Sequence, residues 1–299
     1  MSDYKVGIFG LGAMGFGMAG ALRRAGLMTH GFDINTDAVA NFKAEGGADG
    51  TLDEVASTLD AAVVVVVNAA QTEAVLFGAN GIATKLAKGT AVISCATVAP
   101  DFARDMARRC DELGLLYLDA PVSGGTIKAG EGTLSILAAG TPAAFQKSGP
   151  ALDAMSAKVF ALGDEAGAGS SMKAVNQMLT GVHIAAMAEA MTFGMTQGVE
   201  PAKFLEVITQ CAGNSWALES RAPSIVNGDY HPLSAVDIWP KDLGIVLDIA
   251  KSAKFSAPIT AVALQQYLAA SGSGLGGEHD SAVAKVYARN AGLTLPGQD

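Results

Sequence analysis

The chain has 299 residues, with 20 Lys and Arg against 29 Asp and Glu, which makes the formal net charge −9 at pH 7. Half of the residues are hydrophobic and 16% are charged, compared with roughly 25% charged residues in an average globular domain. This composition excludes a disordered chain, because it provides ample apolar surface to bury and little self-repulsion. The acidic balance and the lack of a Lys/Arg cluster argue against nucleic-acid binding.

Neither a membrane span nor a secretory leader is expected. Mean hydropathy is +0.32, yet the longest apolar run, 61–67, stops at Asn68 and is far shorter than the roughly 20 residues of a spanning helix. The first residues, MSDYKVGIFG, lack the basic start and apolar stretch of a signal peptide. The cysteines are widely spaced and the histidines dispersed, so we expect no disulfide framework, no metal site and a cytoplasmic location.

Short apolar runs alternate with amphipathic stretches in the first half of the chain. Strands are expected at 5–9, 29–32, 61–67, 91–94, 115–118 and 133–138. Helices are expected between them, at 14–25, 35–43, 52–59 and 100–113. Because strands that alternate with helices form parallel sheets, this pattern predicts an α/β fold with a Rossmann-type doubly wound sheet.

The pattern changes near Gly163. A long stretch at 172–197, rich in Ala, Met, Val and Leu and free of proline, is apolar nearly all round and predicts a buried central helix. Further helices are expected at 201–210, 242–253, 258–270 and 279–287. We therefore expect a Rossmann domain at 1–163 and an all-helical domain at 164–299, which begins with the long helix.

A glycine-rich motif follows the first expected strand and opens the first expected helix. Its first glycine permits a tight turn, its second lets the backbone approach a pyrophosphate, and its third allows close packing of helix on strand. The N–H groups at the helix N-terminus can then bind the phosphates. The motif consists of Gly10, Leu11, Gly12, Ala13, Met14 and Gly15. These glycines could serve packing alone, but the strand and helix around them favour a nucleotide site.

An acidic residue, Asp33, ends the second expected strand. A carboxylate at this place accepts hydrogen bonds from the adenosine ribose hydroxyls and repels a 2′-phosphate. Neither Ile34 nor Asn35 supplies a cation that could accept such a phosphate. The sequence therefore predicts NAD rather than NADP as the cofactor.

The stretch DAPVSGG at 119–125 follows an expected strand, at the edge where open α/β sheets bind their ligands. Ser123 beside Gly124 and Gly125 suits a carboxylate, because bare backbone N–H groups can close on an anion. Taken alone, the segment is better explained as an ordinary turn rich in Ser and Gly.

Lys173 lies at the beginning of the long apolar stretch, where a charge is costly unless it has a partner or a task. Asn176 follows three residues later, on the same helical face. A lysine beside a substrate hydroxyl can accept its proton as hydride leaves the carbon, and its ammonium stabilises the developing alkoxide. The alternative is a lysine that extends from the helix start to solvent.

Lys241 follows Trp239 and Pro240 at the start of another expected helix. The proline fits a helix start, and Asp242 complements the helix dipole. Lys241 has no such structural role, which makes it a candidate contact to cofactor or substrate.

Four motifs in order, FGLGAMGFGMA, DAPVSGG, GAGSSMKAVNQ and WPKDL, resemble the β-hydroxyacid dehydrogenase family over the whole chain. This family includes 3-hydroxyisobutyrate and 6-phosphogluconate dehydrogenases. Stretches such as GGTIKAGEG, GVHIAAMAEA and HPLSAVDIWPKDL are similar to its threonate-type subgroup. The resemblance implies NAD-linked oxidation of the C2 hydroxyl of L-threonate, a four-carbon sugar acid, to 2-oxotetronate.

The resemblance also implies roles for single residues. Lys173 would be the catalytic acid and base. The substrate would be held by Ser123, Gly124, Gly125 and Asn176, and the cofactor would be contacted by Asn68, Thr97 and Lys241. Lys128 occupies a position where the family usually has glycine. It would serve either as an extra cation for a polyhydroxy acid or as a solvated loop residue. Gln177 replaces the second of two asparagines that follow the lysine in most of the family.

Several alternatives stay open at this point. A dehydrogenase of 3-hydroxyisobutyrate or a reductase of small semialdehydes would share these motifs, and most of the family acts on a 3-hydroxyl. An imine reductase would be expected to lack Lys173, and a silent NAD-binding protein would not need Ser123, Lys173 and Asn176 together. The expected partners are a small hydroxy-acid substrate and further copies of the chain, in a homodimer or homotetramer that buries the apolar helices.

Overall fold

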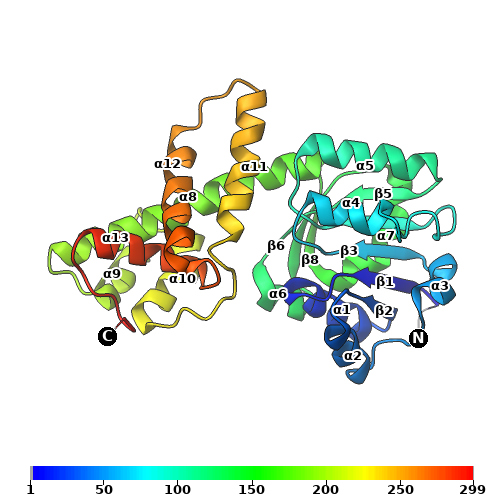
Figure 1. Cartoon of the computed structure of the whole chain (residues 1–299), viewed down its shortest axis with the longest axis horizontal. Coiled ribbons are helices and arrows are strands. Elements are labelled where there is room, and N and C mark those ends of the chain that lie inside the picture. The colour runs from blue at the N-terminus through cyan, green and yellow to red at the C-terminus, as the bar shows by residue number, and fades with distance from the viewer. Residues whose placement is uncertain (1–2, 299) are drawn as a thin grey trace. The chain divides into compact units, whose positions relative to one another are not determined.

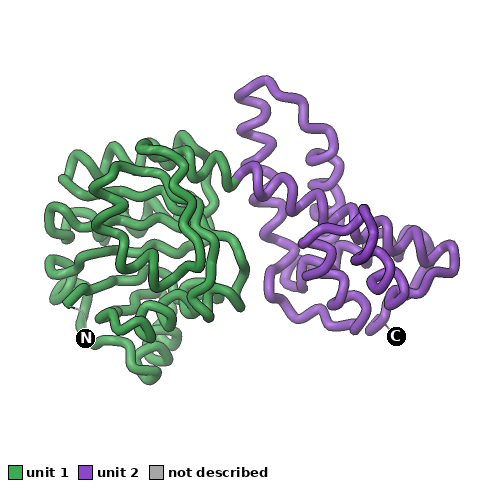
Figure 2. The backbone as a smooth tube through the Cα atoms, turned by 180° about the vertical axis from the view of Figure 1, so that it is seen from behind, with its two compact units in different colours: residues 1–173 green, residues 174–299 purple. Residues whose placement is uncertain are grey.

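The structure, a computed structural model, describes residues 3–298. The chain forms two compact units, residues 1–173 and 174–299, and the change from one to the other falls inside a long helix (Figure 2). The domain boundary expected between residues 163 and 164 lies just before this helix and stays a prediction. Each unit has its own hydrophobic core.

The first unit contains a sheet of five parallel strands (Figure 1). The strands are β1 (Lys5–Phe9), β2 (Met28–Phe32), β3 (Ala61–Val64), β4 (Ala91–Ser94) and β5 (Leu116–Asp119). They lie in the order β2-β1-β3-β4-β5, so the chain extends the sheet first on one side of β1 and then on the other. Ligands bind at such a switch point in open α/β sheets, outside the carboxyl ends of the strands. The expected Rossmann-type sheet is confirmed.

Helices cover both faces of this sheet. Ile8 and Val63 pack into one apolar cluster with residues of α1 and α7, whereas Phe9 and Val64 pack into another with residues of α4 and α5. Alternate residues of a strand point to opposite faces, so strands covered on both sides become continuous apolar runs. The helices are α1 (Ala13–Arg24), α2 (Thr36–Ala44), α3 (Leu52–Val55), η1 (Ala56–Thr58), α4 (Ala69–Phe77), α5 (Pro100–Glu112), α6 (Gly125–Glu131) and α7 (Pro142–Met155).

The strand expected at 133–138 does not join the parallel sheet. It forms β7 (Leu134–Ala138) in a second sheet, between β6 (Val122–Ser123) and β8 (Ser156–Ala161). β6 is antiparallel to β7, and Asp119 and Ala139 exchange two backbone hydrogen bonds of 3.0 and 2.8 Å in an antiparallel bridge. The chain therefore reverses direction after β5. A further parallel strand beside β5 would need a long crossover connection, which the chain does not make before β7.

The second unit is built from helices. They are α8 (Ala168–Thr196, which begins in the first unit), α9 (Pro201–Ile208), α10 (Trp216–Asn227), α11 (Ile238–Ser252), α12 (Pro258–Ala270), η2 (Ser271–Leu275), η3 (Asp280–Val283) and α13 (Ala284–Asn290). The expected α/β domain followed by an all-helical domain is confirmed. Within residues 3–298, no helix is long and apolar enough to cross a membrane.

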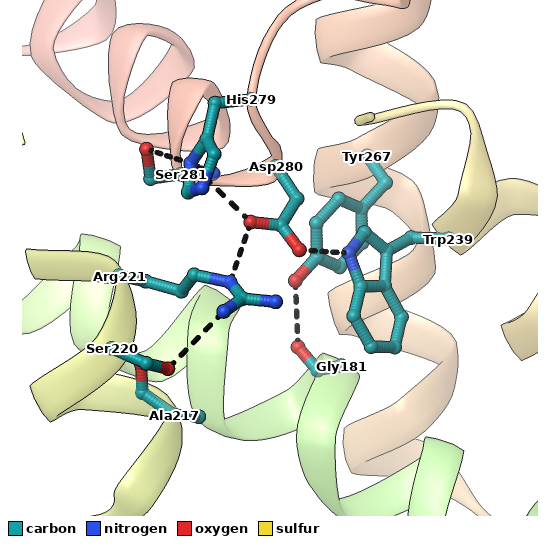
Figure 3. Close-up of polar contacts among 9 residues, drawn as sticks. All are labelled: Gly181, Ala217, Ser220, Arg221, Trp239, Tyr267, His279, Asp280 and Ser281. Atoms are coloured by element: carbon teal, nitrogen blue, oxygen red, sulfur yellow. Dashed lines mark hydrogen bonds and ion pairs between the residues drawn. The ribbon is translucent and has the colours of Figure 1, made fainter. Parts of the chain in front are cut away.

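A buried polar cluster lies in the core of the second unit (Figure 3). The Asp280 carboxylate is 0% exposed and accepts hydrogen bonds from Arg221 Nε at 2.9 Å and from Trp239 Nε1 at 3.2 Å. The Trp239 ring stacks on Tyr267, whose hydroxyl donates to the Gly181 carbonyl at 2.8 Å. This network ties α11, α12 and the segment before α13 to α8.

The long helix, expected to be a buried central helix, is buried along one side within a single chain. α8 buries Ile184, Ala188 and Met191, but Val175, Leu179 and Phe193 are each more than half exposed, at 53%, 52% and 65%. The other helices of the second unit cover only part of the circumference of α8, so an apolar stripe is left uncovered. Apolar composition predicts that a helix can be buried, but the packing decides which side is.

Candidate active site

The glycine motif forms a tight turn between β1 and α1. Gly10 has φ +104°, and a Cβ added there would lie 2.1 Å from the Val65 carbonyl oxygen. A Cβ at Gly15 would lie 1.9 Å from the Gly10 carbonyl oxygen. By contrast, apart from Gly12 itself and its two chain neighbours, no heavy atom of the described residues lies within 4 Å of a Cβ added at Gly12. The backbone at Gly12, the N-cap of α1, therefore borders open space that fits a phosphate group.

Asp33 stands beside this turn at the end of β2. Its Oδ2 accepts the backbone N–H of Leu11 at 2.6 Å, and its Oδ1 accepts that of Asn35 at 2.8 Å. The next residue, Ile34, is fully exposed. The carboxylate is thus held at the glycine turn where a ribose would follow the pyrophosphate, and the adjoining residues offer no cation for a 2′-phosphate. This arrangement fits NAD.

Two further expected cofactor residues lie beyond the carboxyl ends of the next strands. Asn68 follows β3 and is the N-cap of α4, where its Oδ1 accepts the Gln71 N–H at 2.9 Å. Thr97 lies half-buried between β4 and α5. With Gly10 and Asp33, these residues follow four strands of one parallel sheet, so all of them lie along its carboxyl edge.

The segment after β5 forms the expected serine-glycine turn. Ser123 ends β6, and Gly124 and Gly125, with φ +138° and +76°, lead into α6. A Cβ added at Gly124 would lie 2.9 Å from Lys128 Cδ. The aliphatic stem of Lys128 therefore lies against the turn, although Lys128 as a whole is exposed. The structure brings these four residues together.

Lys173 is buried near the start of α8. Its Nζ donates a hydrogen bond of 2.8 Å to the carbonyl oxygen of Val122, the residue that precedes Ser123. Lys173 and the serine-glycine turn are thus adjacent within the first unit. Hydrogen bonding to the carbonyl compensates the amine for its burial and directs it to this turn.

Asp119, the last residue of β5, holds the beginning of α8. Its Oδ2 accepts the backbone N–H groups of Gly167 and Ser170, both at 2.8 Å, and its Oδ1 accepts the Ser170 hydroxyl at 2.7 Å. Burial raises the pKa of the Asp119 carboxyl, although these three hydrogen bonds act in the opposite direction. A carboxylate at a helix N-terminus also complements the helix dipole. The sequence marked Asp119 only as the start of a motif and missed this role.

In the second unit, Asn176 and Lys241 belong to one polar group. Asn176 Nδ2 donates to Gln177 Oε1 at 3.0 Å, and Gln177 Nε2 donates to Asp242 Oδ2. Asp242 Oδ1 lies 2.7 Å from Lys241 Nζ. In the sequence, Gln177 stands out only as a departure from the family pattern, and Asp242 only as a complement to the helix dipole. The available signal was the presence of two polar residues, Gln177 and Asp242, on apolar helices.

Comparison with known proteins identifies the family. Residues 5–163 match the model of the NAD-binding domain of 6-phosphogluconate dehydrogenase, and residues 167–287 match that of the NAD-binding region of NADP-dependent 3-hydroxyisobutyrate dehydrogenase. The chain is 49% identical to L-threonate dehydrogenase of Cupriavidus necator over 295 residues, or 98% of each chain. It is 46% identical to L-threonate dehydrogenase of Escherichia coli K12, over 99% of this chain and 98% of that one.

The solved structures agree. A crystal structure of 3-hydroxyisobutyrate dehydrogenase from Salmonella typhimurium has a TM-score of 0.89 and 46% identity, and the match covers 95% of this chain and 100% of that one. A 3-hydroxyisobutyrate dehydrogenase from Mycobacterium tuberculosis with L-serine has a TM-score of 0.84 at 27% identity, over 95% and 98% of the two chains. The chain therefore belongs to the 3-hydroxyisobutyrate and 6-phosphogluconate dehydrogenase family, the β-hydroxyacid dehydrogenases, and is an NAD-dependent dehydrogenase.

Proposed function

We propose that the chain oxidises the C2 hydroxyl of L-threonate to 2-oxotetronate, with Lys173 as the general acid and base. The observation that carries this proposal is the position of the Lys173 amine, which is buried and 2.8 Å from the carbonyl oxygen of Val122, beside the turn that would bind a carboxylate. Full-length relatives named L-threonate dehydrogenase, at 45% to 49% identity, favour this substrate.

NAD would be held by the glycine turn and its neighbours, and it supplies the hydride acceptor. The pyrophosphate would lie on the backbone of Gly10, Leu11, Gly12, Ala13, Met14 and Gly15, with Asp33 accepting the ribose hydroxyls. Asn68 and Thr97, at the same edge of the sheet, and Lys241 would contact the rest of the cofactor.

The side chains of this protein have separate tasks in the reaction. Ser123 and the N–H groups of Gly124 and Gly125 would bind the substrate carboxylate, with Lys128 adding a cation. Asn176 would offer its carboxamide to another part of the substrate. Lys173 Nζ, as the amine, accepts the proton of the C2 hydroxyl while the C2 hydrogen leaves with its electron pair as hydride. The C–O single bond becomes the carbonyl of the product. As the substrate hydroxyl is converted to the product carbonyl, the Lys173 ammonium stabilises the developing alkoxide by a charge-assisted hydrogen bond.

A second candidate is oxidation of 3-hydroxyisobutyrate, or reduction of a small semialdehyde. The solved structure with 46% identity carries the name 3-hydroxyisobutyrate dehydrogenase, which favours this reading. The two candidates share the lysine and the cofactor and differ in which carbon bears the reacting hydroxyl.

One assay separates the candidates. Purified protein is mixed with NAD and, in turn, L-threonate, D-threonate, L-erythronate and 3-hydroxyisobutyrate, and the reduced cofactor is followed by absorbance. We expect the highest kcat/KM with L-threonate. Rapid turnover of 3-hydroxyisobutyrate without turnover of threonate would overturn the substrate assignment.

A variant tests the mechanism. Lys173→Ala removes the proton acceptor, and we expect kcat to fall by about a hundredfold to ten-thousandfold. Binding of NADH, measured by its fluorescence, should change little. Lys158→Ala, on the exposed strand β8, is the matched control and should keep its kcat. A Lys173→Ala enzyme that keeps most of its kcat would refute the role of the lysine.

We also propose that the chain acts in the cytoplasm as a homodimer or homotetramer. Val175, Leu179 and Phe193 on α8, together with Ile259 and Val262 on α12, are large apolar side chains that are more than half exposed. Such surfaces are typical of protein interfaces, and the same stripes on a second copy are the occupant we propose. Light scattering should give a multiple of 30.2 kDa, which Phe193→Asp should reduce; a monomer mass for the unchanged protein would refute the proposal.

A further inference from the structure

The chain of hydrogen bonds from Asp242 to Asn176 has a direction. The Asp242 carboxylate is buried and ion-paired with Lys241, and an ionised carboxylate offers only acceptors. Gln177 must therefore present its NH2 group, Nε2, to Asp242. This leaves Gln177 Oε1 on the other side of the carboxamide, where it accepts from Asn176 Nδ2 at 3.0 Å.

The orientation of the Asn176 carboxamide follows from that of Gln177. One Nδ2 hydrogen is used on Gln177, so the rest of the Asn176 carboxamide offers one acceptor, Oδ1, and one remaining Nδ2 hydrogen. This pair complements a hydroxyl group, which both donates and accepts. A carboxylate, which only accepts hydrogen bonds, would be repelled at the same place by the lone pairs of Asn176 Oδ1.

The hydrogen bonds from Asp242 through Gln177 to Asn176 form a relay. The packing of α11 on α8 sets the distance between its two ends, Asp242 on α11 and Asn176 on α8. A Cβ added at Gly181 of α8 would lie 2.8 Å from Trp239 Cε3 of α11, so the two helices approach closely at this point. Gln177 lies one turn before Gly181, and Asp242 lies three residues after Trp239, on the same side of α11. Trp239 is in turn held by Asp280 and by stacking on Tyr267 (Figure 3).

We propose that Asp242 is a positioning residue that acts through Gln177 and turns Asn176 Oδ1 to accept a hydrogen bond from a substrate hydroxyl. The inference deepens the proposed function and rests on it, because Asn176 is taken there as a substrate contact. It assigns the site to hydroxylated acids and explains the long carboxamide at position 177, which spans the gap between Asn176 and Asp242.

An isosteric variant breaks the relay. In Gln177→Glu the donor that faces Asp242 becomes an acceptor, and two carboxylates meet. The KM for L-threonate should rise by about tenfold or more, the factor that corresponds to loss of one net hydrogen bond. The KM for NAD should change less than about twofold, whereas a general loosening of the fold would raise the KM for NAD as well. Gln265→Glu, on the exposed side of α12, is the control and should leave both constants unchanged.

The double variant Gln177→Glu with Asp242→Asn restores the relay with its polarity reversed. The amide at position 242 can donate to the carboxylate at position 177, which still accepts from Asn176. We expect the KM for L-threonate to return to within about threefold of the original value, whereas loss of a charged group that serves only stability would not be rescued in this way. Binding of L-threonate to the enzyme–NADH complex, measured by NADH fluorescence, should show the same loss and rescue without turnover.

The outcomes separate this inference from the proposed function. If the unchanged enzyme oxidises L-threonate and Gln177→Glu leaves its KM unaltered, or the double variant is no better than the single one, the relay is refuted and the proposed function stands. If the unchanged enzyme oxidises 3-hydroxyisobutyrate instead, the proposed function is refuted. The same variants are then measured with that acid, and an unaltered KM again refutes the relay.

Discussion

Two buried aspartates, one in each unit, are stabilised by different means. Asp119 in the first unit is bound by two backbone N–H groups and one hydroxyl at the start of α8. Asp280 in the second unit is bound by the guanidinium of Arg221 and the indole N–H of Trp239 (Figure 3). Neutral donors permit a buried carboxyl group to gain a proton, and burial raises the pKa of Asp119. Asp119 therefore anchors the helix that carries Lys173, whereas Asp280 balances the partly buried cation of Arg221.

The largest expected effect comes from removing that cation. Arg221→Met leaves the Asp280 charge buried and unpaired, and we expect the free energy of unfolding to fall by about 3 to 5 kcal/mol. Urea unfolding followed by circular dichroism measures the change. Lys203→Met breaks an exposed pair with Glu206 and should cost less than about 1 kcal/mol. Equal effects of the two variants would contradict the view that Asp280 depends on charge pairing.

Isosteric neutralisation compares the two aspartates directly. Asp280→Asn turns an amide NH2 towards Arg221 or Trp239, both of which are donors, and should lower the free energy of unfolding by about 2 kcal/mol. Asp119→Asn keeps an oxygen for the two N–H groups and can donate to the Ser170 hydroxyl, so its cost should stay below about 1 kcal/mol. Both are measured by urea unfolding, and the reverse order would refute the comparison.

The close approach of α8 to the strands of the first unit gives the third prediction. A Cβ at Gly169 would lie 2.4 Å from the Leu137 carbonyl oxygen and 2.7 Å from that of Asp119, so Gly169→Ala should destabilise the protein by about 1 to 3 kcal/mol. Gly244→Ala on α11 meets open space and should stabilise it by about 0.5 to 1 kcal/mol. Thermal unfolding of the two variants should therefore shift in opposite directions, and a raised melting temperature for Gly169→Ala would contradict the tight contact.

The smallest effect concerns pH and His279, next to Asp280. Burial lowers the pKa of His279, and the cation of Arg221 acts the same way, while Asp280 and Asp229 oppose them. As pH falls, His279 is therefore protonated at a higher pH in the unfolded chain than in the folded one. The His279 contribution to stability is fully present above the unfolded pKa of about 6.5 and is lost as pH falls below it. Urea unfolding between pH 7.5 and 5.5 should show a steeper decline for the unchanged protein than for His279→Gln; parallel curves would exclude this titration.

Many of the helices and strands in both units were predictable, because local patterns determine them. β1 and β4 have the bounds that their apolar runs predict, and α12 has the bounds of its apolar stretch after Pro258. Two helices that the sequence patterns did not predict contain a proline in their interior, Pro150 in α7 and Pro223 in α10. A proline at such a place is more typical of a turn than of a helix. Ala151, Leu152 and Met155 are buried, so tertiary packing stabilises α7 where local propensity does not. β8 was missed because most of its residues are exposed at a sheet edge.

The candidate site divides in the same way. The glycine turn and the residues at the carboxyl edge of the sheet come from motifs that are each a few residues long. The helix anchor at Asp119 and the pairing of Gln177 with Asp242 join residues that are 51 and 65 positions apart. No local pattern connects such residues, so the sequence marked them only as parts of motifs or as departures from the family.

By itself, the sequence determined an α/β half followed by a helical half, a nucleotide turn with an acid selecting NAD, and a lysine at the head of a long apolar helix. These features depend on neighbours within a few residues, on periodicity and on the special backbone of glycine. Only the tertiary structure decided that β7 leaves the parallel sheet, that α8 keeps an exposed apolar stripe, and which donors meet each buried carboxylate. The reason is that a buried polar group must be satisfied by whatever the packed chain brings to it, however distant in sequence.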